Sequence, residues 1–150
     1  TFSGPWGKFV SNGESPGPRL VFATDTGITA ALGLLQGLGS RPLADATKAL
    51  WLIESDDYFL PPSFVQSLLR RRCQNFGVAP TREVGDATRV GSALAMLERL
   101  LESTLPSTAF LAGDGAVIYP VRERLIGAGM QKENIHLEAF FNNPERKAQP

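Results

Sequence analysis

The stretch Leu20–Leu35, "LVFATDTGITAALGLL", joins two apolar patterns through a short polar turn. Leu20–Thr24 is an apolar run with the length and composition of a buried strand. From Ile28 the apolar residues recur at helical spacing as far as Leu38, and Gly39 is a plausible helix stop. The stretch therefore predicts a strand, a tight hydroxyl-rich turn and a helix.

The same alternation repeats along the rest of the chain. Further strands are expected at Lys48–Glu54, Val78–Glu83, Thr108–Gly113 and Asn134–Phe140, and further helices at Pro61–Phe76, Gly91–Glu102 and Ala116–Gly127. Gly77 is expected to end the second helix. Five strands alternating with four helices predict a three-layer α/β domain, with a five-stranded parallel sheet and helices on both faces. Ligands bind such sheets beyond the carboxyl ends of the strands, so the turns after the strands are the candidate site.

Composition narrows the class of protein. The chain has 150 residues, of which 43% are apolar and 20% charged, which fits one globular domain. Its net charge of zero argues against nucleic-acid or membrane-surface partners, which need a basic field. A single cysteine, Cys73, and a single histidine, His136, allow no internal disulfide and too few ligands for a zinc site. We expect Cys73 to be a buried helix residue and His136 a structural residue.

Targeting signals are not apparent in the sequence. No apolar run approaches the ~20 residues of a membrane span, and the N-terminus lacks a signal-peptide pattern. We therefore expect a cytoplasmic protein without a membrane span. The absence of an initiating Met suggests a fragment of a longer chain.

The turn after the first strand offers Thr26, Gly27, Ile28 and Thr29. A glycine lets the backbone approach a ligand, and the helix N-terminus that follows favours an anion such as pyrophosphate. Alternatively, one of the two threonines merely caps the helix. In the ligand interpretation, Gly27→Val abolishes nucleotide binding and leaves the fold largely intact. Asp25 has no evident role, because a carboxylate beside a diphosphate is unfavourable unless it points away or binds a ribose.

The next two turns carry charge. Glu54–Asp57 can accept hydrogen bonds from a ribose or can cap a turn. Thr81, Arg82 and Arg89 follow the third strand, and two arginines with a hydroxyl can hold a phosphate monoester. A solvated charge pair is the competing interpretation of the arginines.

The last two turns carry glycines and aromatic residues. Gly113, Asp114 and Gly115 suggest close backbone approach to a flat ligand. Phe140 and Phe141 end the fifth strand, where they can cap a cofactor or pack against another domain.

In this order, these segments resemble the pyridine-nucleotide domain of the ferredoxin–NADP reductase family over essentially the whole chain. "GPWGKF" (Gly4–Phe9) is similar to the strand that closes that family's flavin domain, and "TDTGIT" (Thr24–Thr29) to its pyrophosphate turn, with Ala30 where proline is usual. "TRE" (Thr81–Glu83) and "RV" (Arg89-Val90) resemble the pieces that hold a 2′-phosphate. "AGDG" (Ala112–Gly115) resembles the nicotinamide-side turn, and "IHLEAFF" the ending near the flavin.

The resemblance implies a function. NADP(H), or alternatively NAD(H), would pass a hydride to FAD held by a missing N-terminal domain. The electrons would continue to an acceptor such as a ferredoxin, flavodoxin, iron chelate or oxygenase. The implied contacts are Thr26, Gly27, Ile28 and Thr29 for the pyrophosphate, Thr81, Arg82 and Arg89 for the 2′-phosphate, Gly113, Asp114 and Gly115 for the nicotinamide ribose, and Glu138 and Phe140 for the flavin.

The resemblance also implies domain limits. Residues 1–19 would be a remnant of the flavin domain with a linker, 20–141 the NAD(P)-binding domain, and 142–150 a flexible tail. Two departures stand out, because Ala112 replaces the cysteine of the nicotinamide-side turn and Asp114 its proline. They favour an alternative, a non-catalytic nucleotide-sensing or docking module. A siderophore-reducing flavoprotein, which shares the "GPWGKF" start, is the other alternative.

Overall fold

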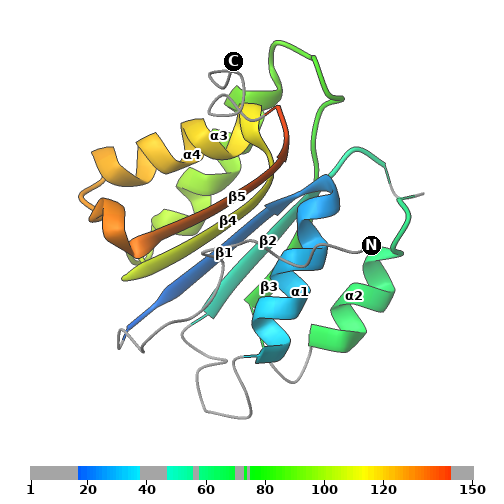
Figure 1. Ribbon diagram of the computed structural model, residues 1–150, viewed down its shortest axis with the longest axis horizontal. Helices are drawn as coiled ribbons and strands as arrows, with labels where there is room; N and C mark the ends of the chain where they lie inside the picture. Colours follow the sequence, from blue (N-terminus) through cyan, green and yellow to red (C-terminus); the bar gives the residue numbers. More distant parts are fainter. Residues whose placement is uncertain (1–16, 38–46, 56–57, 70–72, 74, 143–150) are drawn as a thin grey trace, which may run out of the picture.

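The computed structural model describes residues 17–37, 47–55, 58–69, 73 and 75–142. Its centre is a five-stranded sheet in the order β3-β2-β1-β4-β5, in which every pair of neighbours is parallel (Figure 1). The strands are β1 (Arg19–Thr24), β2 (Thr47–Ile53), β3 (Asn75–Pro80), β4 (Thr108–Asp114) and β5 (Ile135–Phe141). The predicted five-stranded parallel sheet is confirmed.

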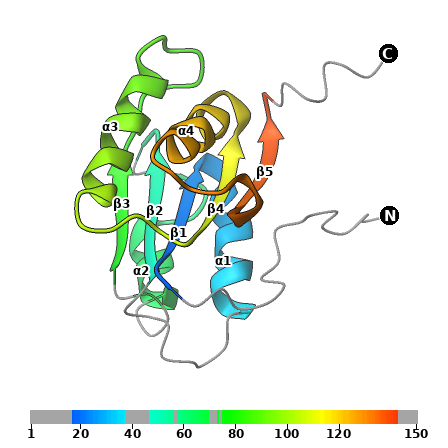
Figure 2. The ribbon, with the colours of Figure 1, turned by 90° about the vertical axis from the view of Figure 1, so that its left-hand side faces the viewer.

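Helices cover both faces of the sheet (Figures 1 and 2). One face carries α1 (Ile28–Gly37) and α2 (Pro62–Leu69), and the other carries α3 (Arg89–Leu101) and α4 (Gly115–Gly127). Two short 3₁₀ helices, η1 (Asp25–Gly27) and η2 (Lys132–Asn134), precede α1 and β5. The predicted three-layer arrangement is therefore confirmed. None of the described helices is long and apolar enough to cross a membrane.

The central strand β1 explains how both faces of the sheet are held. All six of its residues are buried. Leu20 and Phe22 belong to the core under α3 and α4, whereas Val21 and Ala23 belong to the core under α1 and α2. Strand residues alternate between faces, so a continuous apolar run is the expected sequence of a strand that is covered on both sides.

The region between α2 and β3 corrects one prediction. The helix expected over Pro61–Phe76 is shorter, because α2 ends at Leu69 and β3 begins at Asn75. Phe76 and Gly77 are strand residues paired with Ala49 and Leu50 of β2, so Gly77 is not a helix stop. Pairing with β2 overrides the local helical pattern, since periodicity alone does not separate a short apolar strand from a helix end.

The end of β3 is shifted in the same way. The strand was expected over Val78–Glu83 but ends at Pro80. One further backbone bond, from Thr81 N to Ile53 O at 2.7 Å, continues the ladder. The segment Gly4–Phe9, expected as the strand that closes a flavin domain, and the tail at 143–150 lie outside the described residues.

The order of the strands places the switch point. The chain moves outward from β1 to β2 and β3, then crosses through α3 to β4 on the other side of β1. The carboxyl ends of β1 and β4 are therefore the place where a doubly wound sheet opens a crevice for a ligand.

Candidate functional site

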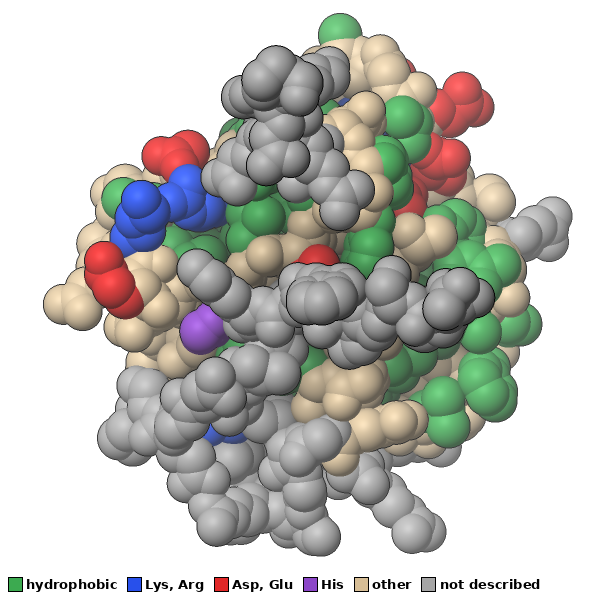
Figure 3. Space-filling view, viewed as in Figure 1, with side chains coloured by type: hydrophobic (Ala, Val, Ile, Leu, Met, Phe, Trp, Pro, Cys, Tyr) green, Lys and Arg blue, Asp and Glu red, His purple; other side chains and the backbone are tan. Residues whose placement is uncertain are grey.

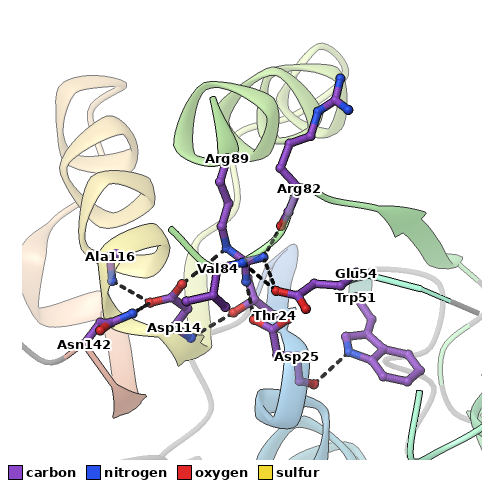
Figure 4. Close-up of polar contacts among 10 residues, drawn as sticks. All are labelled: Thr24, Asp25, Trp51, Glu54, Arg82, Val84, Arg89, Asp114, Ala116 and Asn142. Atoms are coloured by element: carbon purple, nitrogen blue, oxygen red, sulfur yellow. Dashed lines mark hydrogen bonds and ion pairs between the residues drawn. The ribbon is translucent and has the colours of Figure 1, made fainter. Parts of the chain in front are cut away.

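A hydrogen bond joins the ends of β1 and β4 at the switch point. The backbone N–H of Asp114 donates a hydrogen bond to Thr24 Oγ1 at 2.8 Å (Figure 4). Asp114 also caps α4 by accepting from Ala116 N at 3.0 Å, and it accepts from Asn142 Nδ2 at 3.0 Å. Asn142, expected in the flexible tail, is thus tied to the end of β4.

The glycines of this region are required by the fold itself. A Cβ added at Gly27 would lie closer than 3.0 Å to the backbone of Ala112, and one at Gly113 would lie as close to the carbonyl of Thr24. Gly115 meets the backbone of Asn142 in the same way. Contact between chain segments alone accounts for these glycines. The expectation that Gly27→Val leaves the fold intact is wrong, because no side chain fits between η1 and β4.

Arg89, the first residue of α3, lies under these turns. Its side chain is only 3% exposed, and its guanidinium is surrounded by three carboxylates (Figure 4). Nη2 bonds to Asp25 Oδ2, and Nη1 lies 3.1 Å from Glu54 Oε1. Nε forms an ion pair with Asp114 Oδ2 at 3.3 Å without hydrogen-bond geometry. One side chain thus joins the ends of β1, β2 and β4.

This setting differs from both expectations for Arg89. Arg89 is neither a solvated charge pair nor a cation presented to a phosphate. Its guanidinium nitrogens face the three carboxylates at the edge of the sheet and not the solvent. Nη1 also donates to the carbonyl of Arg82, which fixes the β3–α3 loop. The sequence did contain a signal for this arrangement. Asp25 was an acidic residue without a role, and a buried carboxylate needs a cation.

Asp25 has an unusual backbone and an unusual acidity. Its φ of 51° lies in the left-handed region, and its carbonyl accepts a hydrogen bond from Trp51 Nε1 at 2.9 Å. Burial raises the pKa of the Asp25 carboxyl, Arg89 opposes that rise, and the carboxylates of Glu54 and Asp114 add to it. The rise prevails because desolvation by burial is the largest of these effects. Among the described residues, no group bonds to Asp25 Oδ1.

The surface above this network carries the remaining predicted phosphate ligands. Thr26 and Thr29 are exposed, and Thr29 Oγ1 donates to the carbonyl of Thr26 at 2.8 Å. Arg82 is exposed, and its side chain points away from the cluster around Arg89 (Figure 4). Thr81 is half-buried at the end of β3. The structure thus brings the β1 turn and the β3–α3 loop to one edge of the sheet.

The two residues predicted to face the flavin lie on the edge strand β5. Glu138 is half-buried and pairs with Ala112. The register shifts so that Ala139 pairs with Gly113 and Phe141 with Asp114, which leaves Phe140 as a bulge. Its side chain is 41% exposed. A bulge re-aims a side chain at a sheet edge, and no residue pattern in the sequence indicated it.

Cys73 and His136 have settings that packing explains. Cys73 is buried as expected, but it lies beyond the end of α2 and not in a helix. Its thiol donates to Thr47 O at 3.3 Å, and burial raises its pKa. The His136 ring stacks on Phe110 with centroids 4.8 Å apart. Within the described ranges, no group of three or more His, Cys, Asp or Glu residues is placed to hold a metal ion.

Comparison with known proteins finds a likeness of fold. No protein-family model and no curated protein sequence matches the chain. The FAD/NAD-binding domain of a nitric oxide dioxygenase from Vibrio cholerae matches with a TM-score of 0.60 and 18% identity, over 85% of this chain and 53% of that chain. Ferredoxin–NADP⁺ reductase from Plasmodium falciparum matches with a TM-score of 0.56 and 13% identity, over 83% and 52%.

A third solved structure, a cytochrome P450 reductase from Amycolatopsis, matches with a TM-score of 0.61 and 18% identity. It is covered over 38% of its length, and this chain over 85%. The chain therefore spans about half, or less, of the structures that it matches. At these identities the likeness shows the fold, and at that level it confirms the resemblance to ferredoxin–NADP reductase-like proteins.

Proposed function

We propose that this chain is the pyridine-nucleotide-binding part of a flavin-dependent NAD(P)H reductase. The observation that carries the proposal is the position of the turn at Asp25–Gly27. It lies at the switch point of a doubly wound sheet and leads directly into α1, in a fold shared with reductases. Parallel sheets of this kind bind ligands at that point.

The turn and helix α1 would hold the pyrophosphate. The N-terminus of a helix presents free N–H groups and a positive dipole end, which favour an anion. Thr26, Gly27, Ile28 and Thr29 form this end, and the two threonines are exposed. The Asp25 carboxylate does not oppose the anion directly, because it points inward to Arg89.

The β3–α3 loop would hold the adenosine 2′-phosphate. Arg82 is exposed and charged, and Thr81 lies beside it with a hydroxyl. A guanidinium suits a phosphate monoester, because its planar donors can bind two oxygens at once. Arg89 is assigned a different role from the one that the resemblance implies. It positions the turns and does not bind phosphate. The assignment of Arg82 to the 2′-phosphate favours NADP(H), with NAD(H) as the alternative.

The nicotinamide end would lie toward β4 and β5. Gly113, Asp114 and Gly115 would border the nicotinamide ribose, and Glu138 and Phe140 would face the flavin. A bound nicotinamide would supply a hydride to FAD held by an N-terminal domain. The residues of this chain only bind and orient the nucleotide. An acceptor such as ferredoxin, flavodoxin, an iron chelate or an oxygenase would receive the electrons.

Two observations favour the second candidate, a nucleotide-sensing or docking module without hydride transfer. Ala112 offers no thiol to the nicotinamide. Asp114 is 1% exposed and committed to Arg89, Ala116 and Asn142. The siderophore-reducing flavoproteins remain a third candidate, on the resemblance of Gly4–Phe9.

Calorimetric titration of the chain with NADPH and NADH tests nucleotide binding. Arg82→Gln is expected to weaken NADPH about tenfold and to leave NADH unchanged, since a hydrogen bond to a charged group contributes about 1.5 kcal/mol. Arg124→Gln is the control, because Arg124 is exposed on α4. A chain that binds neither nucleotide would overturn the proposal.

The full-length protein distinguishes the two candidate functions. Reduction of its bound flavin by NADPH, followed by absorbance, supports the reductase. Nucleotide binding with no reduction of the flavin supports the sensing module.

A further inference from the structure

Three aromatic rings lead outward from the pyrophosphate turn. Trp51 is fully buried in β2, and its Nε1 donates to the carbonyl of Asp25 at 2.9 Å. The Tyr58 ring packs edge-on against Trp51, with centroids 5.8 Å apart and planes at 73°. The Phe59 ring packs against Tyr58 at a tilt of 58°, with centroids 4.9 Å apart. Tyr58 and Phe59, which we call the aromatic shelf, are thereby fixed relative to Asp25.

The shelf is exposed to solvent at Phe59, whereas Tyr58 is half-buried and Trp51 beneath it is fully buried. Phe59 is 56% exposed, the largest value among the exposed large apolar side chains of the described residues. Figure 3 shows hydrophobic side chains at the surface over α2, where Phe64 is 49% exposed. Single exposed aromatic residues are common in proteins. Phe59 differs from Phe64 because ring contacts connect it to the candidate ligand turn.

The shelf lies close enough to the acidic residues Asp25 and Glu54 for their charges to act on Tyr58. Burial, followed by the charges of Asp25 and Glu54, raises the pKa of Tyr58 to about 12. The phenol therefore stays neutral, and its ring presents no charge to a ligand. Glu54 Oε1 accepts from Val84 N at 2.7 Å, which joins the end of β2 to the loop that carries Arg82. The shelf and Arg82 thus belong to the same edge of the sheet.

We propose that Tyr58 and Phe59 form the platform on which the adenine ring of the nucleotide stacks. The proposal rests on the proposed function, because it presumes a dinucleotide whose pyrophosphate lies at η1 and α1. A purine has an apolar flat face, and exposed aromatic rings bind such faces by stacking. The β3–α3 loop carries no aromatic residue between Thr81 and Thr88.

The assignment gives each part of the nucleotide a separate contact. The adenine lies on Phe59 and Tyr58, the ribose passes over the end of β2 near Glu54, and a 2′-phosphate reaches Arg82. Nicotinamide mononucleotide contains no adenine and does not use the shelf. The two halves of the dinucleotide therefore report separately on the shelf and on the rest of the site.

Calorimetric titration of the full chain with AMP, NADPH and nicotinamide mononucleotide tests the shelf. Phe59→Leu keeps an apolar side chain but removes the ring. It is expected to weaken AMP and NADPH at least about fivefold, the lower end of the loss found when a base loses its stacking partner. The affinity for nicotinamide mononucleotide is expected to stay unchanged. Phe59→Trp restores a ring and is expected to restore AMP binding.

Phe64→Leu is the matched control, because Phe64 is an exposed aromatic residue on α2 without a ring contact to Tyr58. It is expected to bind all three compounds as the unaltered chain does. Unchanged AMP affinity in Phe59→Leu, or an equal loss of nicotinamide mononucleotide, overturns the shelf while the proposed function stands. If the unaltered chain binds neither AMP nor NADPH, the proposed function itself fails.

Discussion

The carboxyl edge of the sheet has two halves that are built in opposite ways. At β1 and β4, the turns are rich in glycine, buried except at Thr26, and held in place by Arg89. At β2 and β3, the loops expose Arg82, Val84 and Phe59. The inner half supplies a fixed backbone, and the outer half supplies side chains that face solvent. A site of this kind needs both, because contact residues bind well only when their support is rigid.

The inner half is expected to tolerate no side chain at Gly27. Gly27→Ala places a Cβ closer than 3.0 Å to the backbone of Ala112, which lies in strand β4. Backbone of a buried strand cannot move aside cheaply, so the loss of stability is expected to exceed about 4 kcal/mol. Urea denaturation followed by circular dichroism measures it.

The control for this prediction is Gly33→Ala on the exposed side of α1. No atom lies within 4 Å of a Cβ added there. Alanine favours a helix over glycine, so this variant is expected to gain up to about 1 kcal/mol. If both alanine variants were equally stable, the close packing of η1 on β4 would be wrong.

The same substitution, arginine to methionine, can be made at Arg89 in the inner half and at Arg82 in the outer half. Arg89→Met leaves the buried carboxylates of Asp25 and Asp114 without a cation, and breaking a buried ion pair in this way is expected to cost about 3 kcal/mol. Arg82→Met, seven residues away in the chain, is expected to change stability by less than about 0.5 kcal/mol. The free energies of unfolding in urea decide between them.

Binding and stability should separate for these two arginines. Arg82→Met is expected to lose NADPH affinity without losing stability, whereas Arg89→Met loses both. An Arg89→Met protein that is as stable as the unaltered chain would show that the network does not hold the inner half together.

The sequence predicted the strands and helices to within a residue or two, except in the region from α2 to β3. β1, β4 and α4 carry patterns that local periodicity and burial both support, and their expected bounds lie within a residue or two of the observed ones. The region from α2 to β3 was predicted less well. Phe76 and Val78 suit a helix end as well as a strand, and only pairing with Ala49 and Trp51 decides between them.

The candidate site shows the same division. The topology of parallel sheets predicted that the turns after the strands would meet, and they do. The partner of Asp25 could not be predicted, because Arg89 lies 64 residues further along the chain. Arg89 was assigned to the surface by its resemblance to a phosphate-binding segment, whereas burial among three acids is a property of the folded chain. The bulge at Phe140 likewise depends on register between strands.

The pH dependence of stability distinguishes a carboxyl in the inner half from one in the outer half. The folded chain raises the pKa of Asp25 above the ordinary value of 3.8, chiefly by burial. The folded state therefore binds this proton more tightly than the unfolded state. The resulting stability is fully present below 3.8 and is lost as the pH rises through the raised pKa.

Asp25→Asn isolates this contribution, because asparagine does not titrate. From about pH 4 to about pH 7, the stability of the unaltered chain relative to Asp25→Asn is expected to fall by at most about 1.4 kcal/mol per pH unit. Asp86→Asn is the control. Hydrogen bonds from Thr88 lower the pKa of Asp86 in the exposed β3–α3 loop, so its contribution is lost only as the pH falls below 3.8. If the difference in unfolding free energy between the unaltered chain and Asp25→Asn stayed constant over that range, the pKa of Asp25 would not be raised. The inner half would then stabilise its carboxylates as well as water does, and the two halves would not differ in their electrostatics.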